Sequence, residues 1–405
     1  MVLLQGHDIL AFTYADWHAS WSTPQQIMSR LAPQNRVLFV DQPRSFLYGI
    51  KRPDPQGAGV WQGPRLQEVR PNLLVYHPPH CFLPVGRLPL SLAKVTLRLN
   101  GRRLARLVGK QMRKLGIRRP ILWNFSPLHG KAVPHLPRRL AIYDICDEWA
   151  SYVPDRSGKE VLRWIEEALT RQADLVFVGS ENMLQKRAGL NPEMHVVYHA
   201  ADFAHFSRAA SPNTAVPRDL AGLPRPIIGA IGVMDCARFD VDLVAAVAAA
   251  RPQWSIVLVG PARPGLDLTR LKACANVYLL GNRAVEELPA YLRGMDVALI
   301  PYQMNDATAN IYPLKLQEYL SGAKPVVSPP LPSVRPYGNV VYLADGPEEC
   351  VKAVERALAE DTAERREARQ AVARENSWEQ RVEEKSRHVL RKLQDKMAAE
   401  GANAV

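Results

Sequence analysis

The feature that most constrains the fold is a series of short apolar runs that alternate with helix-patterned segments. Twelve runs rich in Val, Ile and Tyr stand out, at 37–41, 73–77, 120–125, 140–145, 175–180, 195–200, 227–233, 255–260, 277–281, 297–302, 325–330 and 340–345. Such runs are typical of buried strands, and helical segments between them are typical of parallel α/β units. The sequence therefore predicts an α/β protein with two Rossmann-like, doubly wound parallel sheets, one for each series of six runs.

The length of 405 residues favours two domains, because one compact core rarely grows so large. A segment with four prolines and few large apolar residues, 207–226, has the composition of a linker. We therefore predict an N-terminal domain over 1–206, the linker, and a C-terminal domain over 227–375. A final helix over 376–405 can return to the N-terminal domain, and the charged run before it is expected on the outside of the molecule.

Targeting signals and cysteine spacing point to the cytosol. No stretch reaches the ~18 apolar residues that a membrane-spanning helix needs, and the first residues, MVLLQGHDILAF, lack a basic leader. The cysteines are scattered and none forms a CxxC pair: Cys81, Cys146, Cys236, Cys274 and Cys350. This spacing suggests reduced thiols rather than a disulfide framework or a zinc site.

The net charge of +12 comes from the first half of the chain, since residues 1–210 hold 28 Lys/Arg against 16 Asp/Glu and residues 211–405 hold 24 against 24. Within it, residues 92–120 contain ten basic residues and no acid. Basic residues recur there at every fourth position beside an apolar stripe: Lys94, Arg98, Arg102, Arg106, Lys110 and Lys114. This helix suits an anionic membrane surface, and the alternative is an ordinary solvated basic face. Nucleic-acid binding is disfavoured, because aromatic residues are not interleaved with the basic ones.

The segment PLKLQEYLSGAKPVV, 313–327, is the strongest candidate for a ligand site. Pro313 suits the first turn of a helix, where free N–H groups and the helix dipole favour phosphate oxygens. Lys315 adds positive charge, and Glu318 can accept two hydrogen bonds from a cis-diol such as ribose. The alternative is a plain i, i+3 pair on a solvated face. A dinucleotide site is unlikely, because no GxGxxG follows the first strand of either half.

Two groups of acids have competing interpretations. Asp240 and Asp242 could suggest a metal site, but they precede a helical run and are interpreted as an N-cap and a first-turn acid. Asp144, Asp147 and Glu148 gather at the end of the predicted strand 140–145, where Asp144 and Asp147 can orient or deprotonate an acceptor hydroxyl. Capping by Asp147, with Glu148 in the first turn, remains an equal alternative.

Several motifs together resemble retaining GT-B glycosyltransferases of family 4, of the bacterial surface-polysaccharide type. They span nearly the whole chain: TPQQIMSRLAPQNRVLFVDQPRS (23–45), RRPILWNFSP (118–127), IYDICDEWASY (142–152), LVGP (258–261), NVYLLGNRAVEELPAYL (276–292), DVALIPY (296–302), PLKLQEYLSGAKPVV and ENSWEQRVEE (375–384). The resemblance implies a GT-B fold, with two Rossmann-like domains facing across a cleft.

The resemblance also implies roles for single residues. Glu318 would hold the ribose of a UDP- or GDP-sugar, and the helix start at Pro313 would contact the diphosphate. Asn310 stands where the family often has a second glutamate. In the loop that begins at Gly232, Val233 and Phe239 replace the usual cations, which leaves Arg238 to meet the phosphates, and His199 replaces the Asn of the usual Asn-Gly pair at the hinge strand.

The resemblance predicts a glycosyltransferase that moves a sugar to a lipid-linked or growing polysaccharide acceptor, without metal or cofactor, at the inner face of the membrane. Two alternatives remain open. A GT-B sugar-nucleotide epimerase would act without an acceptor. A non-catalytic scaffold of a polysaccharide assembly complex would explain the changed positions Asn310, Val233 and Phe239.

Overall fold

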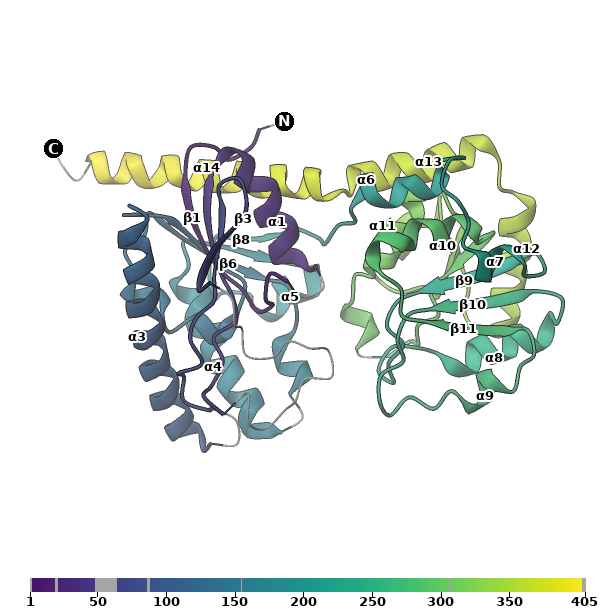
Figure 1. Ribbon diagram of the computed structural model, residues 1–405, viewed down its shortest axis with the longest axis horizontal. Helices are drawn as coiled ribbons and strands as arrows, with labels where there is room; N and C mark the ends of the chain where they lie inside the picture. Colours follow the sequence, from purple (N-terminus) through teal and green to yellow (C-terminus); the bar gives the residue numbers. More distant parts are fainter. Residues whose placement is uncertain are drawn as a thin grey trace. The chain divides into compact units, whose positions relative to one another are not determined.

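The computed structural model describes residues 2–18, 21–47, 64–85, 88–153, 155–305 and 307–402. The chain forms two compact units (Figure 1). Unit 1 consists of Met1–Tyr198 together with Val382–Val405, and unit 2 consists of His199–Arg381. Each unit contains its own parallel sheet, as the two series of apolar runs predicted.

Unit 1 contains an eight-stranded sheet. Its strands are β1 (Asp8–Phe12), β2 (Arg36–Val40), β3 (Leu66–Arg70), β4 (Leu73–Tyr76), β5 (Ile121–Asn124), β6 (Leu140–Ile145), β7 (Leu175–Val178) and β8 (Met194–Val196). Its helices are α1 (Thr23–Leu31), α3 (Leu90–Lys114), α4 (Arg156–Gln172), α5 (Glu181–Lys186) and, from Val382 on, α14 (Trp378–Ala402), with 3-10 turns η1 (Ala32–Gln34), η2 (Pro127–His129), η3 (Val133–His135) and η4 (Trp149–Tyr152). The strand order is β3-β4-β2-β1-β5-β6-β7-β8, and only β3 pairs antiparallel with its neighbour.

Unit 2 contains a six-stranded sheet that is parallel throughout. Its strands are β9 (Ile227–Ile231), β10 (Ser255–Val259), β11 (Val277–Gly281), β12 (Val297–Leu299), β13 (Val326–Ser328) and β14 (Tyr342–Leu343). Its helices are α6 (Phe203–Phe206), α7 (Arg218–Ala221), α8 (Val241–Ala250), α9 (Thr269–Lys272), α10 (Leu288–Gly294), α11 (Leu314–Ser321), α12 (Pro347–Ala359) and α13 (Ala363–Glu375), with η5 (Ser207–Ala210), η6 (Val285–Glu287), η7 (Thr308–Asn310) and η8 (Arg335–Tyr337).

The strand order in unit 2 is β11-β10-β9-β12-β13-β14. Numbered within the unit this is 3-2-1-4-5-6, the order of doubly wound nucleotide-binding sheets. The chain therefore reverses direction across the sheet between β9 and β12. In open α/β sheets, ligands bind beyond the carboxyl ends of the strands at this switch point.

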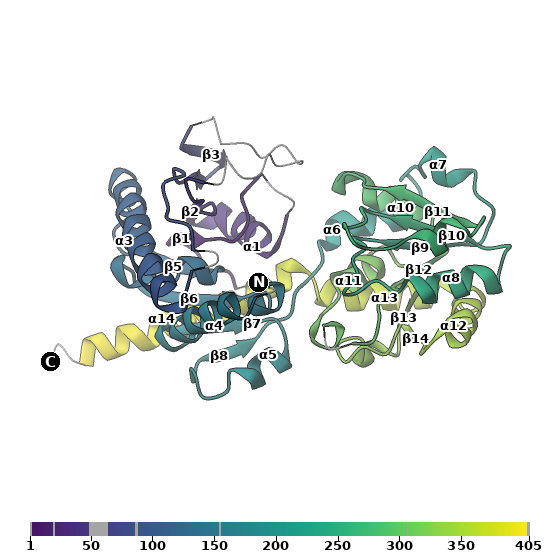
Figure 2. The same ribbon diagram turned by 90° about the horizontal axis from the view of Figure 1, so that it is seen from below.

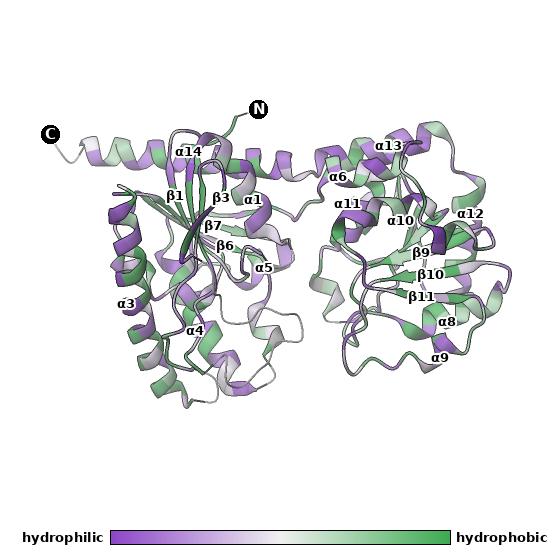
Figure 3. Ribbon diagram, in the orientation of Figure 1, coloured by the Kyte–Doolittle hydropathy of each residue, from purple (hydrophilic) through white to green (hydrophobic). Residues whose placement is uncertain are grey.

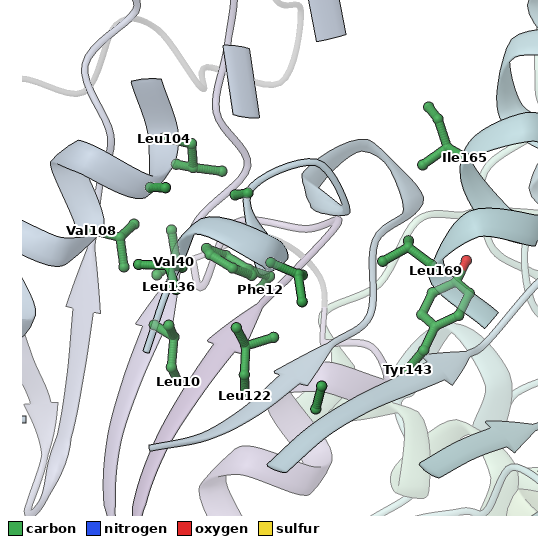
Figure 4. Close-up of a cluster of buried hydrophobic side chains, with 14 of the residues drawn as sticks. Leu10, Phe12, Val40, Leu104, Val108, Leu122, Leu136, Tyr143, Ile165 and Leu169 are labelled. Atoms are coloured by element: carbon green, nitrogen blue, oxygen red, sulfur yellow. The ribbon is translucent and has the colours of Figure 1, made fainter. Parts of the chain in front are cut away.

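Alternating side chains bury both faces of each sheet (Figure 3, strands in green). In unit 2, Ile228 packs with α8 and α12 on one face, and Ile231 packs with α10 and α11 on the other. In unit 1, α3 and α4 cover one face of the sheet, where Leu104 and Ile165 meet strand residues such as Leu10 (Figure 4). Both faces are apolar because parallel sheets are covered by helices on both sides.

The structure agrees with the predicted strands and corrects the predicted linker. Each of the twelve apolar runs contains a strand of the structure. The segment 207–226, however, belongs to unit 2, whose first residue is His199. It contains η5 and α7, and Leu220 is fully buried. A Cβ added at Gly294 would lie 2.3 Å from Leu220 Cδ2, so this segment packs tightly against α10.

The charged run before the final helix, which forms α13, is less exposed than its composition suggested. Arg369 on α13 is 1% exposed, donates from Nε to the carbonyl of Ala323 and pairs with Asp361. Gln370 donates to the carbonyl of Ser321, so α13 satisfies polar groups at the end of α11. The five cysteines are free thiols. In the part of the chain that the structure describes, no helix is both long and apolar enough to span a membrane.

Candidate functional site

A pocket lies at the switch point of the unit 2 sheet. Its lining comes from the ends of β9, β10 and β12, from the residues that follow β9 and β12, and from α11, and includes Gly232, Met234, Tyr302, Lys315 and Tyr319. All of these strands run parallel, so their carboxyl ends meet at this edge (Figure 1). The topology thus gathers loops that are far apart in sequence.

Two glycines bring the loops after β9 and β10 into contact. The N–H of Gly232 donates to the carbonyl of Val259 at 2.8 Å. Gly260 has a φ of 140°, and a Cβ there would lie 2.0 Å from the carbonyl oxygen of Gly232. Only glycine fits such a position, because any side chain would strike the neighbouring backbone. The loop after β9, which lines the pocket, is therefore packed directly against the backbone of Gly260.

Helix α11 points its N-terminus at this pocket and is held there by a buried tyrosine. Pro313 is the N-cap rather than a first-turn residue, and the helix begins at Leu314. The hydroxyl of Tyr319 accepts from the N–H of Ile231 at 2.7 Å and donates to its carbonyl at 3.2 Å. Burial raises the pKa of Tyr319, so it stays a neutral phenol. This contact fixes α11 to the end of β9, one residue before Gly232.

Lys315 and Glu318 form an ion pair at the pocket. Lys315 Nζ lies 2.6 Å from Glu318 Oε2, and the two side chains are 24% and 13% exposed. A Cβ at Gly232 would meet Lys315 Cε at 3.4 Å, so the lysine stem lies over that glycine. The i, i+3 pair expected from spacing exists, but it lies at the carboxyl edge of the sheet and not on a solvated helix face.

Tyr302, directly after β12, lies among four charges. Burial raises the pKa of its phenol, while Arg238 and Lys315 oppose that rise and Asp235 and Glu318 add to it. Arg238 pairs with Asp235, its Nε lying 2.8 Å from Oδ2. These two cations and two carboxylates surround one hydroxyl and neutralise each other in pairs.

Two predicted donor-site residues are not brought into this group. Asn310 ends η7, and its side chain lies outside the described residues. His199 is the first residue of unit 2, is half-buried and makes contacts of its own. It is absent from the described lining of the pocket. Their proposed contacts with a donor remain predictions.

The structure places Asp144 in an ion pair inside unit 1. The strand β6 continues to Ile145, so Asp144 lies within it and alternates with Tyr143, which faces α3 and α4. Its Oδ2 accepts from Lys385 Nζ on α14 at 2.5 Å and from Trp123 Nε1 at 3.0 Å, and its side chain is 4% exposed. We therefore correct the prediction of a catalytic Asp144, because its carboxylate links the sheet to α14 through these buried contacts.

Asp147 and Glu148 lie beyond the end of β6. Asp147 is half-buried and makes contacts of its own, and its catalytic role remains a prediction. The N-cap of η4 is Glu148 and not Asp147, and the Glu148 side chain makes no cap bond. Glu148 instead accepts from Arg187 Nη1 at 2.6 Å. Glu166 shares that arginine, and burial raises the pKa of Glu166 to about 7.

The basic residues of α3 are exposed, but the apolar stripe between them is not. The exposed cations are Arg98, Arg102, Arg106, Lys110 and Lys114. The stripe residues Leu97, Leu104, Val108 and Met112 are at most 3% exposed and belong to the unit 1 core. The stripe is therefore not available to a membrane.

Asp240 confirms the capping interpretation, because its Oδ1 accepts from the N–H of Leu243 at the start of α8. Asp242 lies in the first turn and pairs with Arg270. Over the described ranges, no group of three or more His, Cys, Asp or Glu side chains could hold a metal ion.

Sequence reasoning missed Tyr302, Tyr319 and Gly260. Tyr302 follows the apolar run of β12 and could have been found, since loops after parallel strands carry ligand sites. Tyr319 had no signal of its own, because its partner Ile231 lies 88 residues earlier. Gly260 ends an apolar run, but only the loop crossing shows why a glycine stands there.

A family model matches the part of the chain that contains this pocket. Residues 225–360 match the family model described as glycosyl transferases group 1, which includes the pocket and α11. A protein of Bacillus subtilis (strain 168), TuaH, whose name assigns it to teichuronic acid biosynthesis as a glycosyltransferase, is 26% identical over 255 residues. That match covers 58% of this chain and 63% of the relative's length.

Solved structures of similar fold cover nearly the whole chain. Sucrose-phosphate synthase from Thermosynechococcus elongatus has a TM-score of 0.65 at 16% identity, covering 96% of this chain and all of that one. A UDP-forming trehalose-phosphate synthase from Burkholderia xenovorans has a TM-score of 0.66 at 12% identity, covering 96% and 99%. Anabaena HepE, solved with UDP and glucose, has a TM-score of 0.61 at 17% identity, covering 95% and 99%. These likenesses confirm the GT-B fold.

Proposed function

We propose that the protein is a glycosyltransferase that uses a UDP- or GDP-sugar donor to build a cell-surface polysaccharide. The observation that carries this is the Lys315–Glu318 pair, which lies beside Gly232 at the switch point of a 3-2-1-4-5-6 sheet. The match of residues 225–360 to glycosyl transferases group 1 and the likeness to TuaH support the same activity.

The donor would exchange the internal ion pair for ligand contacts. Glu318 would accept hydrogen bonds from the two ribose hydroxyls, and Lys315 would turn to the diphosphate. A partly exposed pair is worth little to stability, about 0–1 kcal/mol, so giving it up costs little. Charged hydrogen bonds to the nucleotide would more than offset that loss.

The reaction breaks the bond between the anomeric carbon and the diphosphate oxygen and forms a bond from that carbon to the acceptor oxygen. The acceptor proton goes to the departing phosphate oxygen, so UDP or GDP leaves and no protein base is required. Lys315, Arg238 and the first N–H groups of α11 would stabilise the developing negative charge. Transfer with retention and membership of family 4 belong to this proposal.

The acceptor is proposed to be lipid-linked or a growing glycan, met by unit 1 at the inner face of the membrane. The exposed cations of α3, among them Arg102, Arg106 and Lys110, would face the anionic surface. Reversing the charge of these three should reduce binding to anionic vesicles in sedimentation. Unchanged sedimentation would contradict the membrane contact without touching the donor site.

Calorimetric titration with UDP, GDP, CMP and NAD tests the donor site. We expect saturable binding of UDP or GDP, weakened about ten- to hundredfold by Glu318→Ala, as for hydrogen bonds to a charged group. Glu367→Ala, which removes an exposed carboxylate elsewhere in unit 2, serves as the control and should bind like the parent protein. Lack of binding by any nucleotide would overturn the proposal.

A non-catalytic scaffold is the second candidate. Two observations favour it: Val233 is 37% exposed in the loop where related enzymes have a cation, and Arg238 is already paired with Asp235. A scaffold would keep the fold without nucleotide affinity. An epimerase would bind the donor but convert it without an acceptor, so product analysis with donor alone separates it from a transferase.

A further inference from the structure

Three cations of unit 1 gather around one indole ring. Lys131 Nζ lies 4.0 Å from the ring centroid of Trp164, Lys94 Nζ lies 5.1 Å from it, and Arg98 Cζ lies 5.9 Å from it. These distances are those of cation–π contacts. The arrangement holds three positive charges close together at one end of α3.

Three segments of the chain build this cluster. Lys94 and Arg98 are four residues apart on α3 and so share a face. Trp164 belongs to α4, which packs beside α3 (Figure 2). Lys131 follows η2, and its backbone lies against α3 because Gly101 has no side chain: a Cβ there would be 2.5 Å from the Lys131 carbonyl carbon. The glycine therefore positions the third cation.

No carboxylate of the described residues neutralises this cluster. Helix α3 contains no acid. The acids of α4 pair elsewhere: Glu160 with Arg156, Glu166 with Arg187, and Glu167 with Arg171. Burial, and then the charges of Arg98 and Lys94, lower the pKa of Lys131. The cluster is thus a set of uncompensated charges that a dianion would stabilise.

A cavity in unit 2 also contains several cations, but these have partners within the protein. It is lined by Arg225, Arg366 and Lys324, but Arg225 pairs with Asp296 and Arg366 pairs with Asp361. Lys324 Nζ donates to two backbone carbonyls, at 2.6 and 2.9 Å. Those cations are already satisfied by the protein, whereas the three around Trp164 have no carboxylate partner among the described residues.

An exposed apolar face adjoins the cluster. Leu92, Val95 and Leu99 are 55%, 51% and 49% exposed and lie on one face of the first turns of α3, next to Lys94 and Arg98. The same face continues with exposed basic residues. A ligand with a phosphate and an apolar tail matches this juxtaposition, since lysine and arginine bind phosphate and the leucines would leave water.

We propose that Lys94, Arg98 and Lys131 form a binding site for the dianionic phosphomonoester group of a membrane lipid, with Leu92, Val95 and Leu99 against its hydrocarbon region. This proposal rests on the proposed function in one respect: the bound lipid would either carry the acceptor or lie beside it. The site lies in unit 1, whereas the donor pocket lies in unit 2. Loss of lipid binding at unit 1 and loss of nucleotide binding at unit 2 can therefore be measured separately.

Vesicle sedimentation with matched surface charge tests the site. Phosphatidylcholine vesicles are prepared with phosphatidylglycerol, a phosphodiester, or with phosphatidic acid, a monoester, and adjusted to equal zeta potential. We expect the protein to bind the phosphatidic acid vesicles more tightly. Lys94→Ala/Lys131→Ala should weaken that binding about tenfold and abolish the preference, since each basic group near an anionic surface adds several-fold.

The control is Lys272→Ala/Lys352→Ala, which removes two exposed lysines from unit 2 and should change neither result. Circular dichroism and nucleotide titration check that the variants fold and that unit 2 is unaffected. The proposal would be overturned if the parent protein bound both vesicle types equally, or if the Lys94/Lys131 variant lost the same affinity for both. Either result would mean that the basic residues attract the anionic surface without a specific site. If that variant binds vesicles as the parent protein does but loses affinity for inorganic phosphate, the ligand of the site is soluble phosphate. That result would overturn the proposal of a lipid ligand.

Discussion

The carboxyl edges of the two sheets use charged residues in opposite ways. In unit 2, Lys315 lines the pocket and pairs with Glu318, and the two side chains are 24% and 13% exposed. In unit 1, His77 and Asp41 follow β4 and β2, lie 2.5 Å apart and are about 6% and 5% exposed. The same kind of sheet thus leaves one pair accessible and buries the other.

This difference indicates which unit can exchange internal contacts for a ligand. An accessible pair loses little when a ligand replaces one partner, whereas a buried charge left unpaired costs several kcal/mol. In unit 1, cations around Trp164, on the flank of α3, have no carboxylate partner among the described residues. We infer that unit 2 binds its ligand at the sheet edge and that unit 1 meets anions through a helix.

Breaking a buried pair of unit 1 should give the largest effect. Lys385→Met leaves Asp144 charged and 4% exposed without its cation, so we expect unit 1 to lose about 3–5 kcal/mol. Urea unfolding followed by circular dichroism measures the loss. The affinity of unit 2 for UDP or GDP should not change in the folded variant.

Asp144→Asn combined with Lys385→Met is the control, because it removes both charges and should recover much of the stability. The double variant also tests the chemistry of Asp144. If it folds but no longer transfers sugar, Asp144 has a catalytic role after all, and the contrast between the two sheet edges would be lost.

Gly260→Ala should be the next largest change, this time in unit 2. The new Cβ would lie 2.0 Å from the carbonyl oxygen of Gly232, and the φ of 140° is one that alanine avoids. We expect a cost of about 3 kcal/mol and weaker nucleotide binding, because the loop after β9 must shift. Gly265→Ala is matched to it: φ is 95° there but nothing lies within 4 Å, so about 1 kcal/mol and normal nucleotide binding are expected. Equal effects of the two substitutions would show that the loop crossing does not shape the pocket.

Most of the fold could be predicted from the sequence, because apolar runs and turns report local structure. Strand β1 has the same apolar signal as the others and could have been included. Strand β3 could not, since LQEVR has only two apolar residues and they lie three positions apart, which breaks the period of two, at an exposed edge. The sequence also did not show that 207–226 packs into unit 2, because prolines and small residues suit a linker and a packed loop equally.

The candidate site was predictable only where its residues are neighbours in sequence. Lys315 and Glu318 are three residues apart on one helix, so spacing sufficed. Asp144 was misread because its partner, Lys385, is 241 residues away. Lys94 and Lys131 are brought together by the packing of the Lys131 backbone against α3. That packing is possible because Gly101 has no side chain, and no local sequence pattern predicts it.

The smallest effect concerns a neutral histidine near the carboxyl edge of the unit 1 sheet. His129 is fully buried against the ring of Phe12, and among the described residues neither ring nitrogen has a hydrogen-bond partner. Burial lowers the pKa of His129 to about 3. Between pH 6.5 and 3 the unfolded chain therefore binds a proton that the folded chain does not, and stability falls as the pH falls.

His129→Leu should remove this pH dependence without losing a hydrogen bond. From pH 6.5 to pH 5 the histidine costs the parent protein about 2 kcal/mol, at about 1.4 kcal/mol per pH unit. Urea unfolding at pH 7 and pH 5 should show this drop for unit 1 in the parent protein and a smaller drop in the variant. Equal drops in both would mean that His129 is protonated in the folded state. Unit 1 would then hold an exchangeable charge at its sheet edge, as unit 2 does, and the contrast between the two edges would need another explanation.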